Sequence, residues 1–137
     1  MTTVESVYTG ELRTRATHVR SGQIIETDAP PDNQGKGEAF SPTDLLAAAL
    51  GSCMLTLMGI KARNHDFNVD GTHVSITKTM ASDPRRVSKI EIIFRMPAEV
   101  YTHAQKRLLE HAARNCPVAK SIHPDITQEI TFHYHSN

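Results

Sequence analysis

The hydrophobic pattern of the first forty residues favours strands and then a loop. Residues 4–29 hold β-branched residues in rough alternation with polar ones, which predicts strands, and Ser21-Gly22 is a plausible hairpin turn between two of them. Residues 30–40 are dense in Pro, Gly, Asn and Asp. They predict a loop, and a charged side chain of this loop, such as Lys36 or Glu38, could reach the rim of a site.

A long apolar stretch follows, from residue 41 to about 65, and predicts the central helix. Ser41 can cap it, Pro42 suits the first helical position, and Asp44 can bond back to the cap. Twelve of the sixteen residues 45–60 are apolar, so the helix is expected to be buried on all sides. The apolar run is shorter than the ~20 residues that span a bilayer, so we expect no membrane partner.

The C-terminal half alternates between strand and helix patterns. Residues 67–80 and 87–96 flank a polar turn and predict a second hairpin. Residues 98–115, opened by a proline, repeat apolar positions every four residues and predict an amphipathic helix. A short helical turn at 116–122 and a closing strand at 125–135 complete the chain.

The order β-β-β-α-β-β-α-β, with strands and helices partly segregated, predicts an α+β fold in which antiparallel sheets pack on two helices. The length of 137 residues predicts one domain, 1–137. A helix that is apolar on every face is hard to cover in so short a chain. We therefore expect a homodimer built around these helices.

Charge and cysteine usage restrict the function classes. Fifteen basic and fifteen acidic residues give a formal net charge of zero, so we expect no nucleic-acid partner. The first residues lack a positively charged start followed by an apolar run, which predicts a cytoplasmic protein. Cys53 and Cys116 stand 63 positions apart, which matches neither a zinc knuckle nor a CxxC motif. In the cytosol a merely structural disulfide is disfavoured, so paired reactive thiols become a hypothesis.

The two cysteines differ in setting. Cys53 lies in the middle of the apolar helix, where it is either inert core filling or a reactive thiol in a dry pocket. Cys116 precedes Pro117 and is predicted to cap a short helix, where backbone N–H groups would stabilise its sulfur. A cation turned toward Cys53 would favour its thiolate. The candidates on the first predicted hairpin are Arg13, Arg15, His18 and Arg20.

Eight histidines raise the question of a metal. His133 and His135 could share a face of a strand but have no acidic or thiol partner nearby in sequence. A tetrahedral site would need residues whose spacing gives no support for it, namely Cys53, Cys116, His65 and His123. We predict no metal and no cofactor.

Three stretches together resemble the OsmC/Ohr family of osmotically inducible and organic hydroperoxide resistance proteins, most closely its OsmC-like branch. They are SPTDLLAAALGSCMLTLMGI, NCPVAKSI and LRTRATHVRSG. The resemblance covers essentially the whole chain, and its most specific marks are the cysteine within the helix and the later Cys-Pro. It implies an intertwined homodimer with the two long helices back to back and the active sites at the subunit interface.

The resemblance also implies an antioxidant, thiol-dependent peroxidase. Cys53 would be the peroxidatic thiolate, and Cys116 would resolve its sulfenic acid as a disulfide. An arginine of the N-terminal sheet would activate Cys53; Arg13 fits this role best, with Arg20 in reserve. Organic hydroperoxides would be the substrates, and dithiols such as dihydrolipoyl groups the reductants.

One position departs from the family's peroxidases, which carry a glutamate after the proline that opens the central helix and use it to hold the arginine. Here Thr43 follows Pro42, and Asp44 comes one place later. The departure leaves a second hypothesis open. In it the protein is a non-catalytic dimer that binds a small apolar ligand in the same pocket, or senses redox state without turnover.

Overall fold

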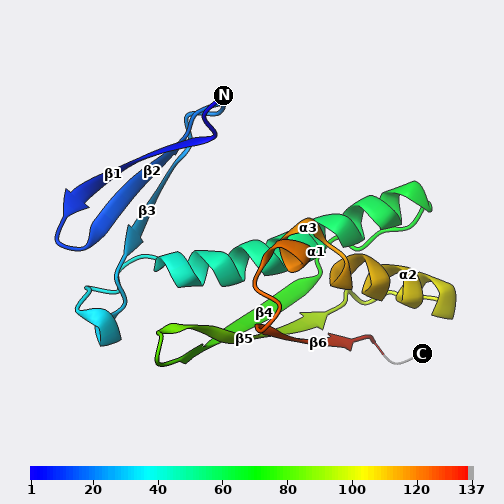
Figure 1. Cartoon of the computed structure of the whole chain (residues 1–137). Coiled ribbons are helices and arrows are strands. Elements are labelled where there is room, and N and C mark those ends of the chain that lie inside the picture. The colour runs from blue at the N-terminus through cyan, green and yellow to red at the C-terminus, as the bar shows by residue number, and fades with distance from the viewer. Residues whose placement is uncertain (136–137) are drawn as a thin grey trace. The chain divides into compact units, whose positions relative to one another are not determined.

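The structure is a computed structural model that describes residues 1–135. Its elements divide between two compact units, one formed by Met1–Leu46 and one that begins at Ala47. Each unit holds one three-stranded sheet. The predicted α+β class is confirmed, and Figure 1 labels the elements in chain order.

The N-terminal unit is an antiparallel sheet of order β1-β2-β3 (Figure 1). Its strands are β1 (Val4–Gly10), β2 (Arg13–His18) and β3 (Ile24–Asp28). The connection to the central helix is the predicted loop, and it contains one short 3-10 turn, η1 (Pro31–Asn33). The strand pattern of the first thirty residues was therefore interpreted correctly.

The hairpin turn differs in length from the one predicted at Ser21-Gly22. Thr17 pairs with Ile24, and the His18 N–H donates to the carbonyl of Gln23, so the loop is the four residues 19–22. Gly22 ends it with a φ of 75°, and its N–H donates to the His18 carbonyl at 2.7 Å. A positive φ favours glycine at this position, so the glycine marked the turn in the sequence. It did not reveal how many residues the turn contains, and the strand register was therefore missed.

The N-terminal sheet encloses no apolar core. Within residues 1–46 the buried residues are the polar Thr27, Asp28 and Ser41. Register places Val4, Tyr8 and Ile25 on one face, and these three residues are 47%, 63% and 49% exposed. A sheet that leaves large apolar side chains in water on this scale needs another protein surface to cover it.

The central helix α1 (Pro42–Asn64) begins as the sequence predicted. The Asp44 N–H donates to Ser41 Oγ at 3.0 Å, and the Ser41 N–H donates to Asp44 Oδ2 at 3.0 Å. This reciprocal pair is a capping box, which satisfies two donors that the helix itself cannot. The hydroxyl of Thr43 lies 3.2 Å from that of Ser41, so both residues after Pro42 are engaged at the cap.

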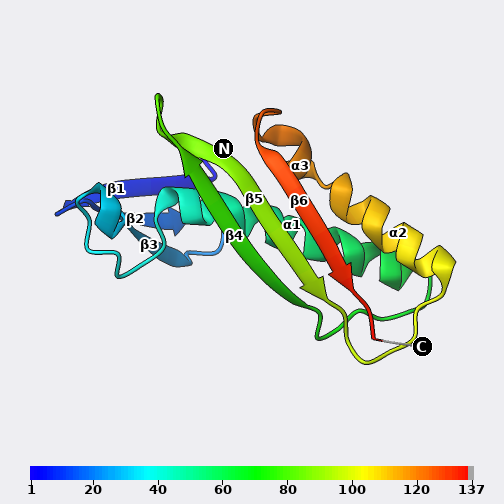
Figure 2. The same ribbon diagram turned by 90° about the horizontal axis from the view of Figure 1, so that it is seen from below.

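The C-terminal unit packs helices on one face of the second sheet. That sheet has the order β4-β5-β6, formed by β4 (His73–Ala81), β5 (Arg86–Arg95) and β6 (Thr127–His133). Figures 1 and 2 show α1 and α2 (His103–Arg114) on the same side of it. The short helix α3 (Pro117–Ser121) follows α2.

The prediction of antiparallel sheets is wrong for one strand pair, because β6 runs parallel to β5. The two strands are joined by α2 and α3, and this length of chain allows a crossover that returns in the same direction, as a tight turn does not. The second sheet is therefore mixed, with β4 and β5 antiparallel.

Two element starts also differ from prediction. Strand β4 begins at His73 rather than Phe67, after a turn in which Gly71 has a φ of 87°. Helix α2 begins after Thr102 instead of Pro97, because Thr102 and Gln105 form a capping box. In both places a local backbone signal overrides the wider hydrophobic pattern.

The core lies entirely in the C-terminal unit. Every buried apolar residue falls between Ala47 and Ala119, and the Phe94 ring stacks on Phe132 with centroids 4.7 Å apart. Gly51 allows α1 to approach β4 closely, since a Cβ there would collide with the Ile76 side chain. The largest buried side chains of this core are Leu50, Met54, Met58, Ile90, Ile92, Phe94 and Leu109.

The prediction that α1 is buried on all sides is not met within the single chain. Ala49, Ser52 and Thr56 are exposed, and Ile60 is 46% exposed. These positions share one face of the helix, opposite the buried Leu50, Met54 and Met58. By length and composition alone α1 could also cross a membrane, a property shared by core helices of soluble proteins.

Candidate active site

The two predicted thiols lie on separate helices of the C-terminal unit. Cys53 is in the middle of α1 and half-buried, and Cys116 caps α3 with none of its surface exposed. The prediction of an N-cap at Cys116 is confirmed, because its Sγ accepts the Ala119 N–H at 3.4 Å. Both cysteines are free thiols.

The structure brings these two thiols together. The Cys53 side chain is close enough to Cys116 to act on the pKa of that thiol. Burial is the main cause that raises the pKa of the Cys116 thiol, and the interaction with Cys53 raises it further. The Ala119 N–H acts in the opposite direction and is outweighed. At neutral pH Cys116 is therefore a protonated thiol, and its S–H can donate a hydrogen bond to the sulfur of Cys53.

Within the single chain Cys53 is half-buried, so it is not sealed in the core of the C-terminal unit. It lies at the border between the buried face of α1 and the exposed face that carries Thr56 and Ile60, so part of its surface is open within one chain. Accessibility combined with a protonated, buried partner is the arrangement expected of a reactive cysteine next to a resolving one.

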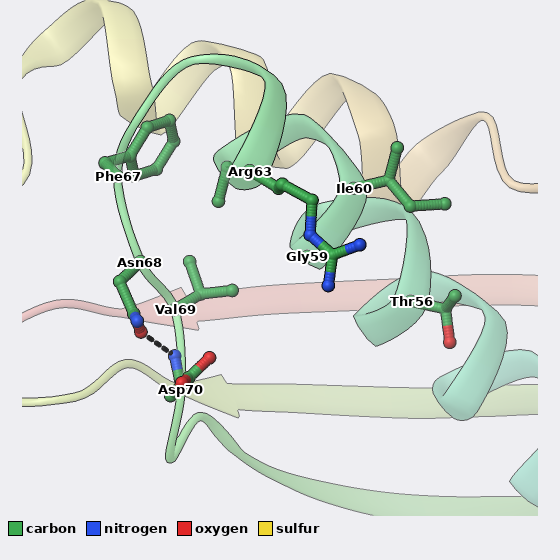
Figure 3. A pocket seen from close by; sticks show the side chains of 9 residues that line it. Thr56, Gly59, Ile60, Arg63, Phe67, Asn68, Val69 and Asp70 are labelled. Atoms are coloured by element: carbon green, nitrogen blue, oxygen red, sulfur yellow. Dashed lines mark hydrogen bonds between the residues drawn. The ribbon is translucent and has the colours of Figure 1, made fainter.

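A cleft lies further along α1, at its C-terminal end (Figure 3). It has a volume of about 540 Å³ and lies between the helix and the loop that follows it. Figure 3 shows Arg63 on the helix and Asp70 on the loop, on the two walls of the cleft. With Thr56, Ile60 and Phe67 also in its wall, the cleft mixes polar and apolar surface, and Cys53 does not line it.

Arg13 belongs to the N-terminal unit, where two carboxylates hold its guanidinium. Nε donates to Asp28 Oδ1 at 2.7 Å and Nη2 donates to Oδ2 at 2.9 Å, which is a two-pronged pair. Nη2 also donates to Glu38 Oε1 at 3.0 Å. The Asp28 pair raises the pKa of Arg13, and the Arg13 hydrogen bonds hold the pKa of Asp28 below its usual range.

The loop before α1 supplies the rest of this network. The Glu38 N–H donates to Asp28 Oδ2 at 3.0 Å, and Lys36 Nζ donates to Glu11 Oε2 at 2.6 Å. The two loop residues singled out in the sequence, Lys36 and Glu38, thus bind side chains of the N-terminal sheet.

Sequence reasoning missed Asp28. It lies directly opposite Arg13 in the β2–β3 pairing, so a correct hairpin register would have found it. The predicted two-residue turn would have paired Arg13 with residue 30 instead. Arg20, the reserve candidate, lies in the hairpin loop and is exposed.

The histidines named as candidate ligands are scattered. In the described part of the chain, residues 1–135, no group of three or more His, Cys, Asp or Glu side chains is placed to hold a metal ion. His65 instead makes a hydrogen bond from its ring to the Lys61 carbonyl, and His123 lies beside Asp125.

The fold and the thiol pair define a class of α+β redox proteins, and comparison with known proteins shows the family. The sequence model of the OsmC-like protein family matches residues 35–131. The chain belongs to this family. Membership supports a redox or peroxide-related role.

Solved structures agree in fold. A protein of Psychrobacter arcticus, described as a proposed osmotic stress induced and detoxification response protein, is 53% identical, with a TM-score of 0.94 over 97% of this chain and 96% of that one. The organic hydroperoxide resistance protein OsmC of Legionella pneumophila is 13% identical (TM-score 0.75, covering 96% and 97%). That of Elizabethkingia anophelis, solved with thiocyanate bound, is 16% identical (TM-score 0.76, covering 98% and 98%). The comparison with curated proteins gave no match.

Proposed function

We propose that this protein is a thiol-dependent peroxidase that reduces organic hydroperoxides through a two-cysteine cycle. The observation that carries the proposal is the proximity of a half-buried Cys53 to the buried thiol of Cys116, whose pKa is raised. Family membership and the names of the Legionella and Elizabethkingia relatives support the choice of hydroperoxides as the oxidants. The protein would act in the cytoplasm.

In the first step the Cys53 thiolate attacks the peroxide O–O bond. The distal oxygen stays on sulfur with its hydrogen, so Cys53 is oxidised to a sulfenic acid, and the other oxygen leaves as an alkoxide that takes a proton from water to become the alcohol. Cys116 then attacks that sulfur and its thiol proton leaves with the hydroxyl as water, which forms the Cys53–Cys116 disulfide. A dithiol, such as a dihydrolipoyl group, reduces the disulfide and is itself oxidised to a cyclic disulfide.

Arg13 is proposed to stabilise the thiolate of the peroxidatic cysteine. Its guanidinium is charged at every working pH, and Asp28 fixes it in one orientation. Arg13 is also half-buried, which strengthens its field compared with an exposed arginine such as Arg15.

The working unit is proposed to be an intertwined homodimer. Two surfaces that the single chain leaves open support this, the apolar face of the N-terminal sheet and the exposed face of α1. A second copy of the chain would cover both, as an isologous interface does.

The test is peroxide turnover with cumene hydroperoxide and dihydrolipoamide. Cys53→Ser is expected to abolish turnover, and Cys116→Ser to consume about one equivalent of peroxide per subunit and then stop. The two variants control for one another, since each retains one thiol. Full activity in Cys53→Ser would overturn the proposal.

A second candidate function is favoured by the two carboxylates on Arg13, whose negative charge exceeds the positive charge of the guanidinium. In it the dimer is non-catalytic, binding a small apolar ligand or sensing redox state. Titration of thiols after one equivalent of peroxide separates these functions. A binding module keeps two slow thiols, a sensor forms the disulfide once without turnover, and an enzyme cycles as long as dithiol is present.

A further inference from the structure

We propose that Asp28 is the positioning residue for Arg13 in this chain and that Glu38 is a second, releasable carboxylate that restrains it. The inference rests on the proposed function, because it assigns the orientation and charge of the arginine used there. Asp28 would supply the anchoring carboxylate that Thr43 cannot, from the neighbouring strand instead of the helix start.

Asp28 is built to hold one orientation. Its side chain is only 2% exposed, and its two oxygens meet Nε and Nη2 of Arg13 in a planar fork. The carboxylate is itself held by the Glu38 N–H at Oδ2, and the Asp28 N–H donates to the Phe40 carbonyl at 3.0 Å. Any rotation of the guanidinium would break two short hydrogen bonds at once.

This anchoring selects which nitrogen is left for chemistry. Nε and Nη2 are occupied, and among residues 1–135 no hydrogen-bond acceptor is assigned to Nη1. A guanidinium donates through all three nitrogens, so Nη1 is the one that remains for a sulfur or peroxide oxygen. Loss of Asp28 would leave the guanidinium held only by the exposed Glu38, through Nη2.

Glu38 differs from Asp28 in burial. Its side chain is 64% exposed and makes a single hydrogen bond to Nη2, and an ion pair so open to water is weak and easily broken. With both carboxylates in place the local charge of the trio is −1, and with Glu38 withdrawn it is 0. Negative charge disfavours a thiolate, so the two carboxylates should act in opposite directions on the reactivity of Cys53.

The experiment compares Asp28→Asn, Glu38→Gln and, as matched control, Glu26→Gln. Glu26 lies on the same strand two residues from Asp28, and its removal changes the charge equally without breaking a hydrogen bond to Arg13. The readouts are kcat/KM for cumene hydroperoxide and, in a Cys116→Ser background, the rate of iodoacetamide alkylation of Cys53 across pH.

Asp28→Asn is expected to lower kcat/KM by roughly 10- to 100-fold, as misplacement of a catalytic group does, and to move the rise of the alkylation rate to higher pH. Asp28→Glu should recover part of the loss. Glu38→Gln should leave both readouts as in the unsubstituted protein or raise them up to a few-fold, and Glu26→Gln should change them by less than about twofold.

Equal readouts in Asp28→Asn and the unsubstituted protein would overturn the positioning role of Asp28. A large loss in Glu38→Gln would overturn the proposal that Glu38 restrains Arg13.

Two further variants separate this inference from the proposed peroxidase function. If Asp28→Asn lowers the melting temperature so far that it cannot be assayed, the exposed Glu38→Gln still tests the opposite effect. Arg13→Ala separates the inference from the function it rests on. If Cys53 is required but Arg13→Ala changes neither readout, the role of Arg13 and with it this inference is wrong, while the peroxidase cycle stands. If Arg13→Ala impairs the enzyme, adding Asp28→Asn should cause no further loss in either readout.

Discussion

The two sheets of this protein have the same number of strands but bury different kinds of residue, apolar in one sheet and polar in the other. The β4-β5-β6 sheet buries Ile90, Ile92 and Phe94 completely under helices of its own unit. The β1-β2-β3 sheet buries only Thr27 and Asp28 among its strand residues. One sheet is held by hydrophobic burial, and the other by its hydrogen-bond ladder and a charged network.

The difference teaches how stability and chemistry are divided in the chain. The C-terminal unit carries the two thiols on helices anchored to a dense core. The N-terminal unit carries the cation and its carboxylates on a sheet whose apolar side chains are still in water. In the proposed homodimer a second copy of the chain would cover this sheet, so the contribution of the sheet to stability should depend on protein concentration.

The largest expected effect is a cavity in the C-terminal sheet. Phe94→Ala removes a fully buried ring that stacks on Phe132 and should cost about 3–5 kcal/mol of unfolding free energy. Val7→Ala in the N-terminal sheet, at a side chain that is 64% exposed, should stay within about 0.5 kcal/mol. Urea denaturation measures both, and equal losses would remove the contrast between the sheets.

Next comes the uncovered face of the N-terminal sheet. Ile25→Ser, on the same face of the sheet as Tyr8 and Val4, should weaken self-association by roughly tenfold, about 1.4 kcal/mol, because it withdraws apolar area from the proposed dimer interface. Sedimentation over a dilution series measures this, with Glu5→Gln on the other face as control. A species of monomer mass at every concentration, in the unsubstituted protein, would contradict the dimer.

The two capping boxes allow a comparison at matched chemistry. Ser41→Ala at the start of α1 and Thr102→Ala at the start of α2 each remove a hydroxyl that accepts a backbone N–H, and each should cost about 1 kcal/mol. Thermal unfolding measures the loss. Ser41 is buried and its hydroxyl also lies 3.2 Å from that of Thr43, so a larger loss at Ser41 would measure what burial and this second contact add. No loss in Thr102→Ala would contradict the capping role.

The smallest effect is on the pH dependence of stability, and it has opposite signs in the two units. The pKa of Asp28 is held low in the folded protein, so its contribution is present above the ordinary carboxyl range near pH 4 and lost as pH falls. The pKa of Cys116 is raised, so its contribution to folding stability is complete below the ordinary thiol value of about 8.5 and lost as pH rises.

In a plot of melting temperature against pH, Asp28→Asn should therefore reduce the slope on the acid side, and Cys116→Ser should reduce the slope on the alkaline side. A Cys116→Ser profile that is as steep in alkali as the original would contradict the second assignment.

Local signals in the sequence determined much of the fold. A cap residue, a proline at the first helical position and a carboxylate three residues on are contiguous, so the start of α1 and the N-cap at Cys116 could be predicted without knowing what packs against them. Where a nearer signal was overlooked, as at Thr102 and Gly71, the boundaries were wrong by several residues.

The sequence alone thus determined the order of the elements, and it singled out Cys53, Cys116 and Arg13 as candidates for the chemistry. Tertiary structure decided the parallel β5–β6 pairing, the partial exposure of Cys53 and the pairing of Arg13 with Asp28. Each of these depends on which distant segments meet and in what register. A shift of one residue in a hairpin exchanges every cross-strand partner, and no local pattern of residues near Arg13 encodes it.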